Sequence, residues 1–133
     1  MKIGYVCSLR EQKYNTNSEQ VIALKKAGCQ TIFNDLLDRV FDDQSNLILA
    51  LEYARAGDIL VVWDTFRLCL DSQNFIDIIQ TLQQRDISLQ ILAGNFLEIK
   101  PRSWESRVML ESYSVLANLE RKYLSWKYFN YAK

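Results

Sequence analysis

Residues 57–63 read Gly-Asp-Ile-Leu-Val-Val-Trp, and the stretch Ile59–Trp63 is the strongest strand signal in the chain. Five apolar residues follow a glycine and an aspartate without a polar interruption. A short apolar run of this kind, bounded by a turn signal, is typical of a strand that is buried on both faces. Strands of that type occur mainly in parallel sheets that helices cover on both sides.

Towards the N-terminus, strand-like and helix-like runs alternate. Each helix-like run has apolar residues at helical spacing and is followed by a glycine, Gly28 or Gly57, which suits a helix C-terminal cap. The predicted elements are a strand at Ile3–Cys7, a helix at Ser18–Ala27, a strand at Cys29–Asn34 and a helix at Asp42–Ala56.

The alternation continues towards the C-terminus. The predicted elements there are a helix at Ser72–Arg85, a strand at Ile87–Leu92, a short strand at Phe96–Ile99 and a helix from Ser103 to about Tyr128. Pro101 suits the start of that last helix. The order predicts an α/β fold: a mostly parallel four- to five-stranded sheet flanked by helices, with a long C-terminal helix.

Length and composition limit the possible functions. The chain has 133 residues, which is enough for one domain and not two. Lys and Arg number 16, as do Asp and Glu, so the net charge is zero and lacks the basic excess of most free-standing DNA-binding proteins. The absence of histidine removes His-based general-base catalysis and His metal ligands.

Neither a metal, a cofactor nor a membrane is expected. The three cysteines, Cys7, Cys29 and Cys69, are far apart and lack CxxC spacing, which disfavours a disulfide framework or a zinc site and favours reduced thiols in the cytoplasm. The opening MKIGYVCSL is unlike a signal peptide. No apolar stretch approaches the ~20 residues that span a bilayer.

The last predicted helix is long for so small a domain. A helix of about 25 residues, at 1.5 Å per residue, is about 40 Å long. Val108, Val115, Leu116, Leu119 and Tyr123 recur along it at helical spacing. We expect its outer apolar face, within residues 103–128, to contact another subunit.

Several stretches resemble the catalytic domain of the serine recombinases, the resolvase and DNA-invertase family. The resemblance covers essentially the whole chain in order. It rests on Ile3–Val6, on Gln20 with Ala23–Leu24 and Ala27–Cys29, on Ile32–Phe33, on Gly57–Trp63, on Phe66–Leu68 and on Leu116–Arg121, which matches the family's long dimerisation helix.

The resemblance implies cleavage of DNA by a serine hydroxyl that attacks a phosphodiester. Arginines surround that phosphate, because the transition state concentrates negative charge and a guanidinium binds two oxygens at once. By the resemblance the site residues here are Ser8 as the nucleophile, Arg67 as a phosphate ligand and Gln20 as a polar neighbour. No cofactor is implied.

The departures from the family pattern are concentrated in this site. Family Arg-Val-Ser corresponds to Cys7-Ser8-Leu9, so Ser8 takes the nucleophile position only with a one-residue gap, and Leu9 takes it otherwise. Arg10 is a possible substitute for the missing arginine. In the family's Asp-Arg-Leu-Gly-Arg, the Asp is replaced by Phe66 and the second Arg by Leu70.

Each site residue also has a purely structural interpretation. Ser8 can cap backbone groups at a strand end, Arg67 can pair with Asp64 or Asp71, and Gln20 can lie on a solvated helix face. Cys7 and Cys69 also fall near the presumed site, but no Arg-rich phosphate loop surrounds either. Small buried cysteines are common in cores.

The C-terminal segment from Lys100 is basic and aromatic. It holds seven Lys or Arg against three Glu, a net charge of +4. Such a helix can follow DNA phosphates or be a solvated face beside a dimer seam. The aromatic group favours packing on this domain or on a partner; its members are Tyr123, Trp126, Tyr128, Phe129 and Tyr131.

The sequence therefore predicts a single resolvase-like catalytic domain over residues 1–133, without the family's C-terminal helix-turn-helix DNA-binding domain. At least three charged catalytic positions are uncharged, so we expect an inactive homologue that acts as an oligomerisation or regulatory module. The expected partner is a second copy or an active recombinase, with weak or no DNA binding by the domain alone. The alternative is a divergent active recombinase that uses Ser8 with Arg67. The setting implied is the cytoplasm of a bacterium, on a mobile element or phage.

Overall fold

The computed structural model describes residues 1–10, 16–39, 42–68, 71–93 and 97–131. Nine α-helices and strands and one 3-10 turn follow one another along this part of the chain, in the alternating order that the sequence predicts. They are β1 (Lys2–Leu9), α1 (Thr16–Lys26), β2 (Thr31–Leu37), α2 (Ser45–Tyr53), β3 (Ile59–Val62), η1 (Thr65–Arg67), α3 (Ser72–Gln84), β4 (Ser88–Ile91), β5 (Leu97–Ile99) and α4 (Trp104–Tyr131).

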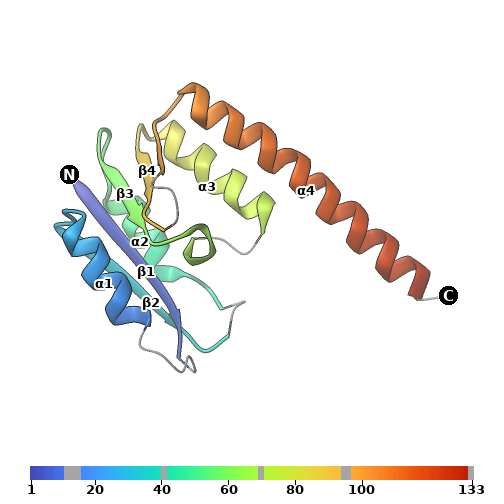
Figure 1. The fold of residues 1–133 in the computed structure, drawn as a ribbon, viewed down its shortest axis with the longest axis horizontal. Coiled ribbons are helices and arrows are strands. Elements are labelled where there is room, and N and C mark those ends of the chain that lie inside the picture. The colour runs from blue at the N-terminus through green and yellow to red at the C-terminus, as the bar shows by residue number, and fades with distance from the viewer. Residues whose placement is uncertain (11–15, 40–41, 69–70, 94–96, 132–133) are drawn as a thin grey trace.

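The strands form one five-stranded sheet in the order β2-β1-β3-β4-β5 (Figure 1). The first four strands are parallel, and β5 is antiparallel at the edge, pairing Leu89 with Ile99. The predicted class, a mostly parallel sheet with a long C-terminal helix, is therefore confirmed. Parallel strands carry their carboxyl ends to one edge, where β1 and β3 lie side by side.

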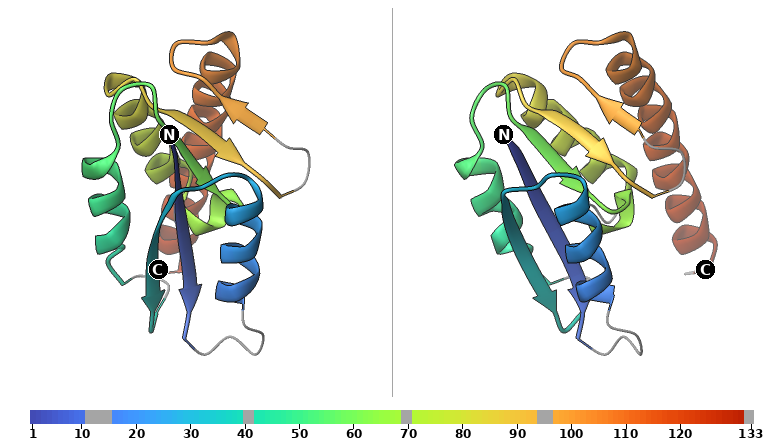
Figure 2. Two further views of the ribbon diagram at one scale, coloured as in Figure 1. Left: turned by 90° about the vertical axis from the view of Figure 1, so that its left-hand side faces the viewer. Right: turned by 60° about the vertical axis from the view of Figure 1, so that its left-hand side comes forward.

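Helices cover both faces of the sheet unequally (Figure 2). α1 alone lies on one face, where Leu24 packs with Val6 and Val61. α2, α3 and α4 lie on the other face over the larger core. That core includes Tyr5 of β1, Phe75 of α3 and the buried residues of β3 and β4 that point to this face. The apolar run that begins at Ile59 is buried because both of its faces meet helices.

The structure corrects some predicted boundaries. The second helix begins at Ser45 rather than Asp42, because the Asp42 carboxylate accepts hydrogen bonds from the backbone N–H groups of Asp38 and Arg39 and holds a turn instead. It ends at Tyr53 because Ala54 is extended. β2 runs three residues further than predicted, to Leu37.

Gly28 and Gly57 have φ values of 99° and 91°. This left-handed conformation favours glycine and ends each preceding segment before a strand. Gly28 therefore ends α1 as predicted, whereas the prediction for Gly57 is wrong: α2 ends at Tyr53, and Gly57 lies in the turn before β3, where its N–H donates to the Asp86 carbonyl.

α4 packs against α3 up to Arg121, and its remaining turns extend beyond α3 (Figure 1). Phe75 and Tyr113 stack with ring centroids 4.2 Å apart, and Ala117 is buried. The Glu120 carboxylate accepts hydrogen bonds from the Ser72 hydroxyl (2.7 Å) and the Ser72 backbone N–H (3.4 Å) at the start of α3, and the Arg121 guanidinium donates to the Gln73 side-chain oxygen at 3.1 Å. The predicted helix is present and extends to Tyr131.

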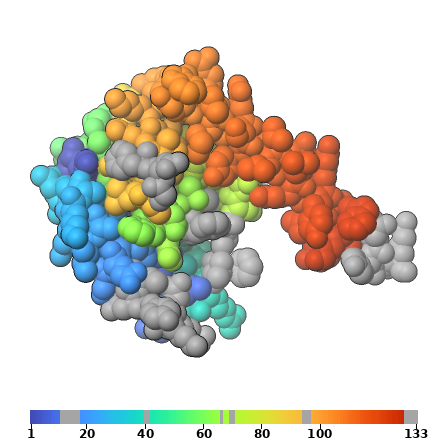
Figure 3. All heavy atoms as spheres, in the orientation of Figure 1, coloured from blue at the N-terminus to red at the C-terminus, as the bar shows by residue number. Residues whose placement is uncertain are grey.

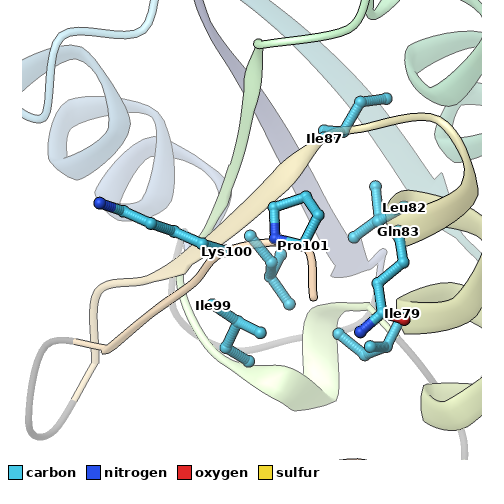
Figure 4. Close-up of a pocket in the computed structure, with 8 residues that line it drawn as sticks. Ile79, Leu82, Gln83, Ile87, Ile99, Lys100 and Pro101 are labelled. Carbon is cyan, nitrogen blue, oxygen red and sulfur yellow. The ribbon is translucent and has the colours of Figure 1, made fainter. Parts of the chain in front are cut away.

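A small hollow lies where α3 meets β4 and β5, beside the turn into α4 (Figure 4). Its cavity volume is about 10 Å³, and its walls include Ile79, Leu82, Ile99 and Pro101. Pockets that bind drug-sized ligands measure about 300–1,000 Å³, so this hollow is a packing gap. Among the described residues, no helix has the length and apolarity needed to cross a membrane.

Candidate functional site

The candidate site lies at the carboxyl end of β1. Side chains alternate between the two faces of a strand. Val6 belongs to the core under α1, and Cys7 belongs to the larger core on the other face, where Leu9 packs too. Ser8 therefore points to the α1 face, and Cys7 and Leu9 point to the face that carries η1.

Ser8 is a buried hydroxyl held by α1. It is 4% exposed, and its Oγ accepts a hydrogen bond from the Gln20 amide nitrogen at 3.2 Å. The same nitrogen donates to the Cys7 carbonyl at 3.0 Å, and the Gln20 amide oxygen accepts from the Cys7 N–H at 3.4 Å. Gln20 thus extends the hydrogen bonding of β1 sideways into α1.

Gln20 itself is 2% exposed. The interpretation that places it on a solvated helix face is therefore wrong. Sequence analysis missed its burial because a glutamine on a helix is usually read as solvent-exposed. A polar side chain can face the core when it hydrogen-bonds to buried backbone groups, as Gln20 does at Cys7.

Arg67 approaches the site from η1, the turn that follows β3. Its Nη1 donates to the Cys7 carbonyl at 3.4 Å, and its Nε lies 3.7 Å from the Asp64 carboxylate, too far for a hydrogen bond. The Nε atom is buried and finds no hydrogen-bond partner among the residues that the structure describes. Of the two acids that the sequence offered Arg67, Asp64 is the neighbour, whereas Asp71 caps α3 through the Asn74 N–H.

The structure adds a buried network that sequence analysis missed. Asp35 of β2 accepts a hydrogen bond from the Tyr5 hydroxyl at 2.7 Å and from the backbone N–H groups of Asn46 and Leu47, each at 3.1 Å. Asp35 thereby caps the N-terminus of α2 from a neighbouring strand, because the N-cap residue Gln44 makes no side-chain cap.

Gln44 closes this network towards Arg67. Its amide nitrogen donates to the Tyr5 hydroxyl at 2.9 Å and to the Arg67 carbonyl at 3.1 Å. A chain of hydrogen bonds therefore joins Asp35, Tyr5, Gln44 and the backbone of η1. One signal was present in the sequence: a carboxylate directly after the strand-like run ending at Asn34, with no cationic neighbour to explain it.

Burial weakens the acidity of two groups at the site. The pKa of the Tyr5 hydroxyl is raised by burial first and then by its bond to the Asp35 carboxylate. Burial also raises the pKa of the Cys7 thiol, against the opposing effects of Tyr5 and of the Arg67 charge. Cys7 is thus a neutral thiol, and a neutral thiol is a poor nucleophile and metal ligand.

Arg10 is not brought to this cluster. It is exposed and pairs with exposed Asp38 at 2.8 Å. Phe66 lies in η1. Leu70 and Cys69 lie outside the described residues. In the part of the chain that the structure describes, no three Cys, Asp or Glu residues are placed to hold a metal.

Three aromatic residues near the end of α4 do not pack on the body of this domain. Tyr123, Trp126 and Tyr128 are 57%, 61% and 70% exposed. For these three the prediction of packing on their own domain is wrong, because α4 runs past its last contacts with α3, at Glu120 and Arg121. The side chains of Phe129 and Tyr131 lie outside the described part of the structure. The alternative, packing on a partner, stays a prediction.

Comparison with known proteins gives one consistent result. The family model described as the resolvase N-terminal domain matches residues 3–128. The DNA-invertase BinR of transposon Tn552 from Staphylococcus aureus is 30% identical over 122 residues, which are 91% of this chain and 62% of that protein. The serine recombinase gin of Escherichia phage Mu is 33% identical over 123 residues, 92% of this chain and 61% of that protein.

The fold has a solved counterpart. A resolvase family site-specific recombinase from Streptococcus pneumoniae superposes with a TM-score of 0.74 at 11% identity, covering 99% of this chain and 96% of the other. The DNA-invertase hin of Salmonella typhimurium is 31% identical over 121 residues, 90% of this chain and 60% of that protein. The chain thus spans about three fifths of the length of the curated relatives it matches.

Proposed function

Because the chain belongs to the resolvase N-terminal domain family, together with serine recombinases and DNA invertases, we propose that it is a member without strand-cleavage activity. Its role in this proposal is that of an oligomerisation or regulatory module. Two regions support the proposal: the carboxyl end of β1, where cleavage chemistry would occur, and α4, where association would occur.

One observation carries the first half of the proposal. The Ser8 hydroxyl is buried and faces α1, where Gln20 binds it, whereas Arg67 lies by the face of β1 that carries Cys7 and Leu9. An attacking hydroxyl and the cation that neutralises the phosphate must converge on one phosphorus atom. Here the Ser8 hydroxyl is bound by Gln20 and the Arg67 guanidinium donates to the Cys7 carbonyl, so each is engaged by the protein's own groups.

The chemistry around the site agrees with that geometry. Stabilising a phosphoryl transition state needs preorganised cationic donors, and losing one such donor commonly costs about 2.7–4 kcal/mol of barrier. The resemblance expects arginine where this chain has Cys7, a buried neutral thiol. Gln44, beside the site, donates its amide nitrogen to the Tyr5 hydroxyl and to the Arg67 carbonyl.

The second half of the proposal rests on α4. Its outer face is apolar and exposed; among its members are Trp104, Val108, Val115, Leu119 and Trp126, which are 47–66% exposed. Contiguous exposed apolar surface marks a protein interface. A second copy or an active recombinase subunit is the proposed partner, and the neutral net charge supports weak DNA binding by this domain alone. The proposed setting is the bacterial cytoplasm.

A divergent active recombinase is the second candidate. It is favoured by one observation: Gln20 and Arg67 both donate to the Cys7 carbonyl, beside Ser8, so a polar group does gather at this strand end. Under this candidate Ser8 would turn towards Arg67 when DNA binds. The same experiment decides between the two.

The test is a trap for covalent attachment to DNA. The protein is incubated with supercoiled DNA, the reaction is stopped with denaturant, and protein-linked DNA ends are sequenced. We expect none, whereas the phage Mu recombinase run in parallel gives adducts at its own site. Adducts that disappear in Ser8→Ala and persist in Ser125→Ala, a change at an exposed serine of α4, would establish the enzyme instead.

A further inference from the structure

The outer edge of β2 is a candidate docking surface that the proposed function does not use. β2 stands at the end of the strand order and pairs with β1 on one side (Figure 2). In the described part of the chain no strand pairs with its other side. A strand edge of this kind presents backbone N–H and C=O groups to an extended segment of another chain.

Backbone alternation identifies the open groups of this edge. The carbonyl of Leu37, the last residue of β2, accepts a hydrogen bond at 2.8 Å from the N–H of the residue that follows β1. Since successive residues of a strand point their backbone groups to opposite sides, those of Ile32, Asn34 and Leu36 point outward. The Asn34 carbonyl already accepts from the Asn46 amide nitrogen at 2.6 Å. Ile32 and Leu36 therefore carry the backbone groups that another strand would bond.

β2 lacks the features that usually protect a strand edge. Such edges are blunted by short length, proline, a bulge or an exposed charged side chain. β2 has seven residues and no proline, and its pairing with β1 runs without a bulge from Thr31 to Leu37. Its one charged residue, Asp35, is buried and turned inward, where it caps α2. Nothing in the strand itself therefore opposes pairing with a second strand.

Apolar side chains flank the open edge. Leu36 of β2 and three residues of α2, namely Ile48, Leu49 and Tyr53, are 47–57% exposed. The Tyr53 ring lies 5.5 Å from the ring of Phe33 in β2, so the apolar area continues from the helix to the strand. Together with the open backbone groups these residues form what we call the β2 edge surface. Strand addition of this kind combines backbone hydrogen bonds with side-chain contacts.

We propose that the β2 edge surface pairs antiparallel with the same surface of a second copy of this chain, about a two-fold axis at Asn34. Ile32 of each copy exchanges backbone hydrogen bonds with Leu36 of the other, because the two residues are equally distant from the axis and both point outward. α2 of one copy lies beside α2 of the other. The two sheets become one continuous sheet through an isologous interface. The proposal goes beyond the proposed function, since it adds an association surface that α4 does not supply.

Charge makes the β2 edge surface complementary to itself. α2 runs opposite to β2, as the helix of a parallel crossover does, so its start lies near the end of the strand. The acids Asp42 and Asp43 precede α2, and Arg55 follows it; all three are exposed. The two-fold axis brings Arg55 of each copy towards the acidic turn of the other. A parallel neighbour would instead place acid beside acid, which is unfavourable. These charges select a second copy of this chain in the antiparallel direction.

The β2 edge surface is separate from α4. β2 and β5 stand at opposite ends of the strand order, and α4 follows β5 and packs on α3. Figure 3 shows the distal half of α4 standing clear of the body. Pairing through β2 therefore leaves the outer face of α4 exposed. A chain with two isologous surfaces forms assemblies larger than a dimer when both are used.

Disulfide trapping tests the axis. Asn34→Cys places one thiol of each copy at the two-fold axis, where directly paired residues have Cα atoms about 5.5 Å apart, within the range of about 4.4–6.8 Å that a disulfide spans. We expect a disulfide-linked dimer after mild oxidation. The matched control is Ile22→Cys, at an exposed residue of α1, the helix that packs over Val6 and Val61 rather than at this edge. It should give no dimer, and the unsubstituted chain controls for the native cysteines.

A charge at the edge supplies an independent readout. Leu36→Lys puts an ammonium group beside the proposed partner strand, so the dissociation constant of the β2 pair should rise at least about ten-fold. Ile22→Lys, which removes an equally exposed apolar side chain elsewhere, should leave it unchanged. Sedimentation equilibrium measures both in a Val115→Glu background, which disables the outer face of α4. Circular dichroism establishes that each variant is folded.

Three results would overturn the proposal. One is a Val115→Glu chain that stays monomeric up to roughly hundreds of micromolar, the range of weak dimers, and gives no disulfide through Asn34→Cys. Another is an equal disulfide yield from Ile22→Cys, which indicates random collision. The third is a dimer that Leu36→Lys leaves unchanged, because its contact then lies elsewhere. Failure of the proposed function is seen separately, as DNA adducts in the trap or as assembly of the native chain that Val115→Glu does not weaken.

Discussion

At the carboxyl end of β1 the domain satisfies its own polar groups by hydrogen bonds, whereas the apolar side chains on the outer face of α4 stay exposed. At the strand end, Asp35, Tyr5 and Gln44 bond to one another and to backbone, and Gln20 covers Ser8. Along that outer face, Trp104 is 66% exposed and Val115 is 61% exposed.

The difference concerns where binding capacity remains. A catalytic site for phosphodiesters must keep cations and a hydroxyl open to an incoming ligand, at a cost in stability. In this chain the region is filled by hydrogen bonds among its own groups, including the Asp35 carboxylate. An interface does the opposite, because it leaves apolar area in water until a partner covers it. This contrast is what the proposed function predicts: association through α4 without strand cleavage at β1.

The largest expected effect breaks the closed region. Asp35→Ala leaves the Tyr5 hydroxyl and two N–H groups of α2 without their acceptor, so the free energy of unfolding should fall by about 2–4 kcal/mol. Urea denaturation measures it. Asp38→Ala removes an exposed carboxylate from the same segment and should change stability by about 0–1 kcal/mol. Equal effects of the two changes would mean that the network does not stabilise the strand end.

The next effect acts on the exposed apolar face of α4. Val115→Glu puts a charge in the middle of that face. The dissociation constant of a dimer formed through this face should therefore rise by roughly ten- to a hundred-fold, equivalent to the loss of one buried valine. Sedimentation velocity measures the change, and circular dichroism should be unaltered. Ser125→Glu, an exposed position of α4 outside that apolar face, is the control. An unchanged dissociation constant would separate the exposed face of α4 from association.

A smaller effect acts where α4 is fastened to the body. Glu120→Gln keeps the shape of the side chain but removes its charge at the start of α3, so stability should fall by about 0.5–1.5 kcal/mol. Hydrogen exchange should increase at the first turn of α3 while the β1 network stays protected. Glu52→Gln, on the exposed side of α2, should be neutral. Protection lost equally at β1 would show that the two regions are coupled.

The smallest expected effect concerns the Asp58 carboxylate, which lies outside both regions and serves as a reference. The pKa of Asp58 lies below its ordinary value of 3.8, chiefly because the Arg55 N–H donates to it and also because the N-terminal ammonium is near. A lowered folded pKa stabilises the protein above the unfolded value, and this contribution is lost as the pH falls through the folded value. Asp58→Asn should lower Tm near neutral pH, and the difference should shrink below about pH 4.

Asp43→Asn, an exposed change, is the control for that series and should not alter the dependence of Tm on pH. A Tm difference between Asp58→Asn and the native chain that stays constant down to pH 2, well below the ordinary carboxyl pKa of about 3.9, would mean that the carboxylate acts through packing rather than charge.

Local patterns were sufficient for most of the fold. The run Ile59–Trp63 predicted a buried strand, Gly28 predicted the end of the first helix, and the unbroken stretch after Pro101 predicted the long helix. Gly57 did not mark the end of α2, which stops at Tyr53. The boundaries of α2 were less predictable. Asp42 reads as a helix-starting acid in sequence, yet in the fold it closes the turn at Asp38 and Arg39.

The candidate site was predicted only in part. The sequence singled out Ser8, Gln20 and Arg67, and the structure gathers donors from Gln20 and Arg67 on the carbonyl of Cys7. Whether these residues catalyse anything stays a prediction. The network of Tyr5, Asp35 and Gln44 was missed, because residues 30 and 39 positions apart meet only when β2 pairs with β1 and α2 packs on that face.

The amino-acid sequence by itself determined the order of elements, the family resemblance and the replacement of charged residues such as those now at Cys7 and Leu70. These depend on identity and on spacing along the chain, which are local properties. Only the tertiary structure decided which side chains face each other. Strand alternation and the packing of α1 placed Ser8 beside Gln20, and α4 runs on past its last contacts with α3, at Glu120 and Arg121, with its outer face in water.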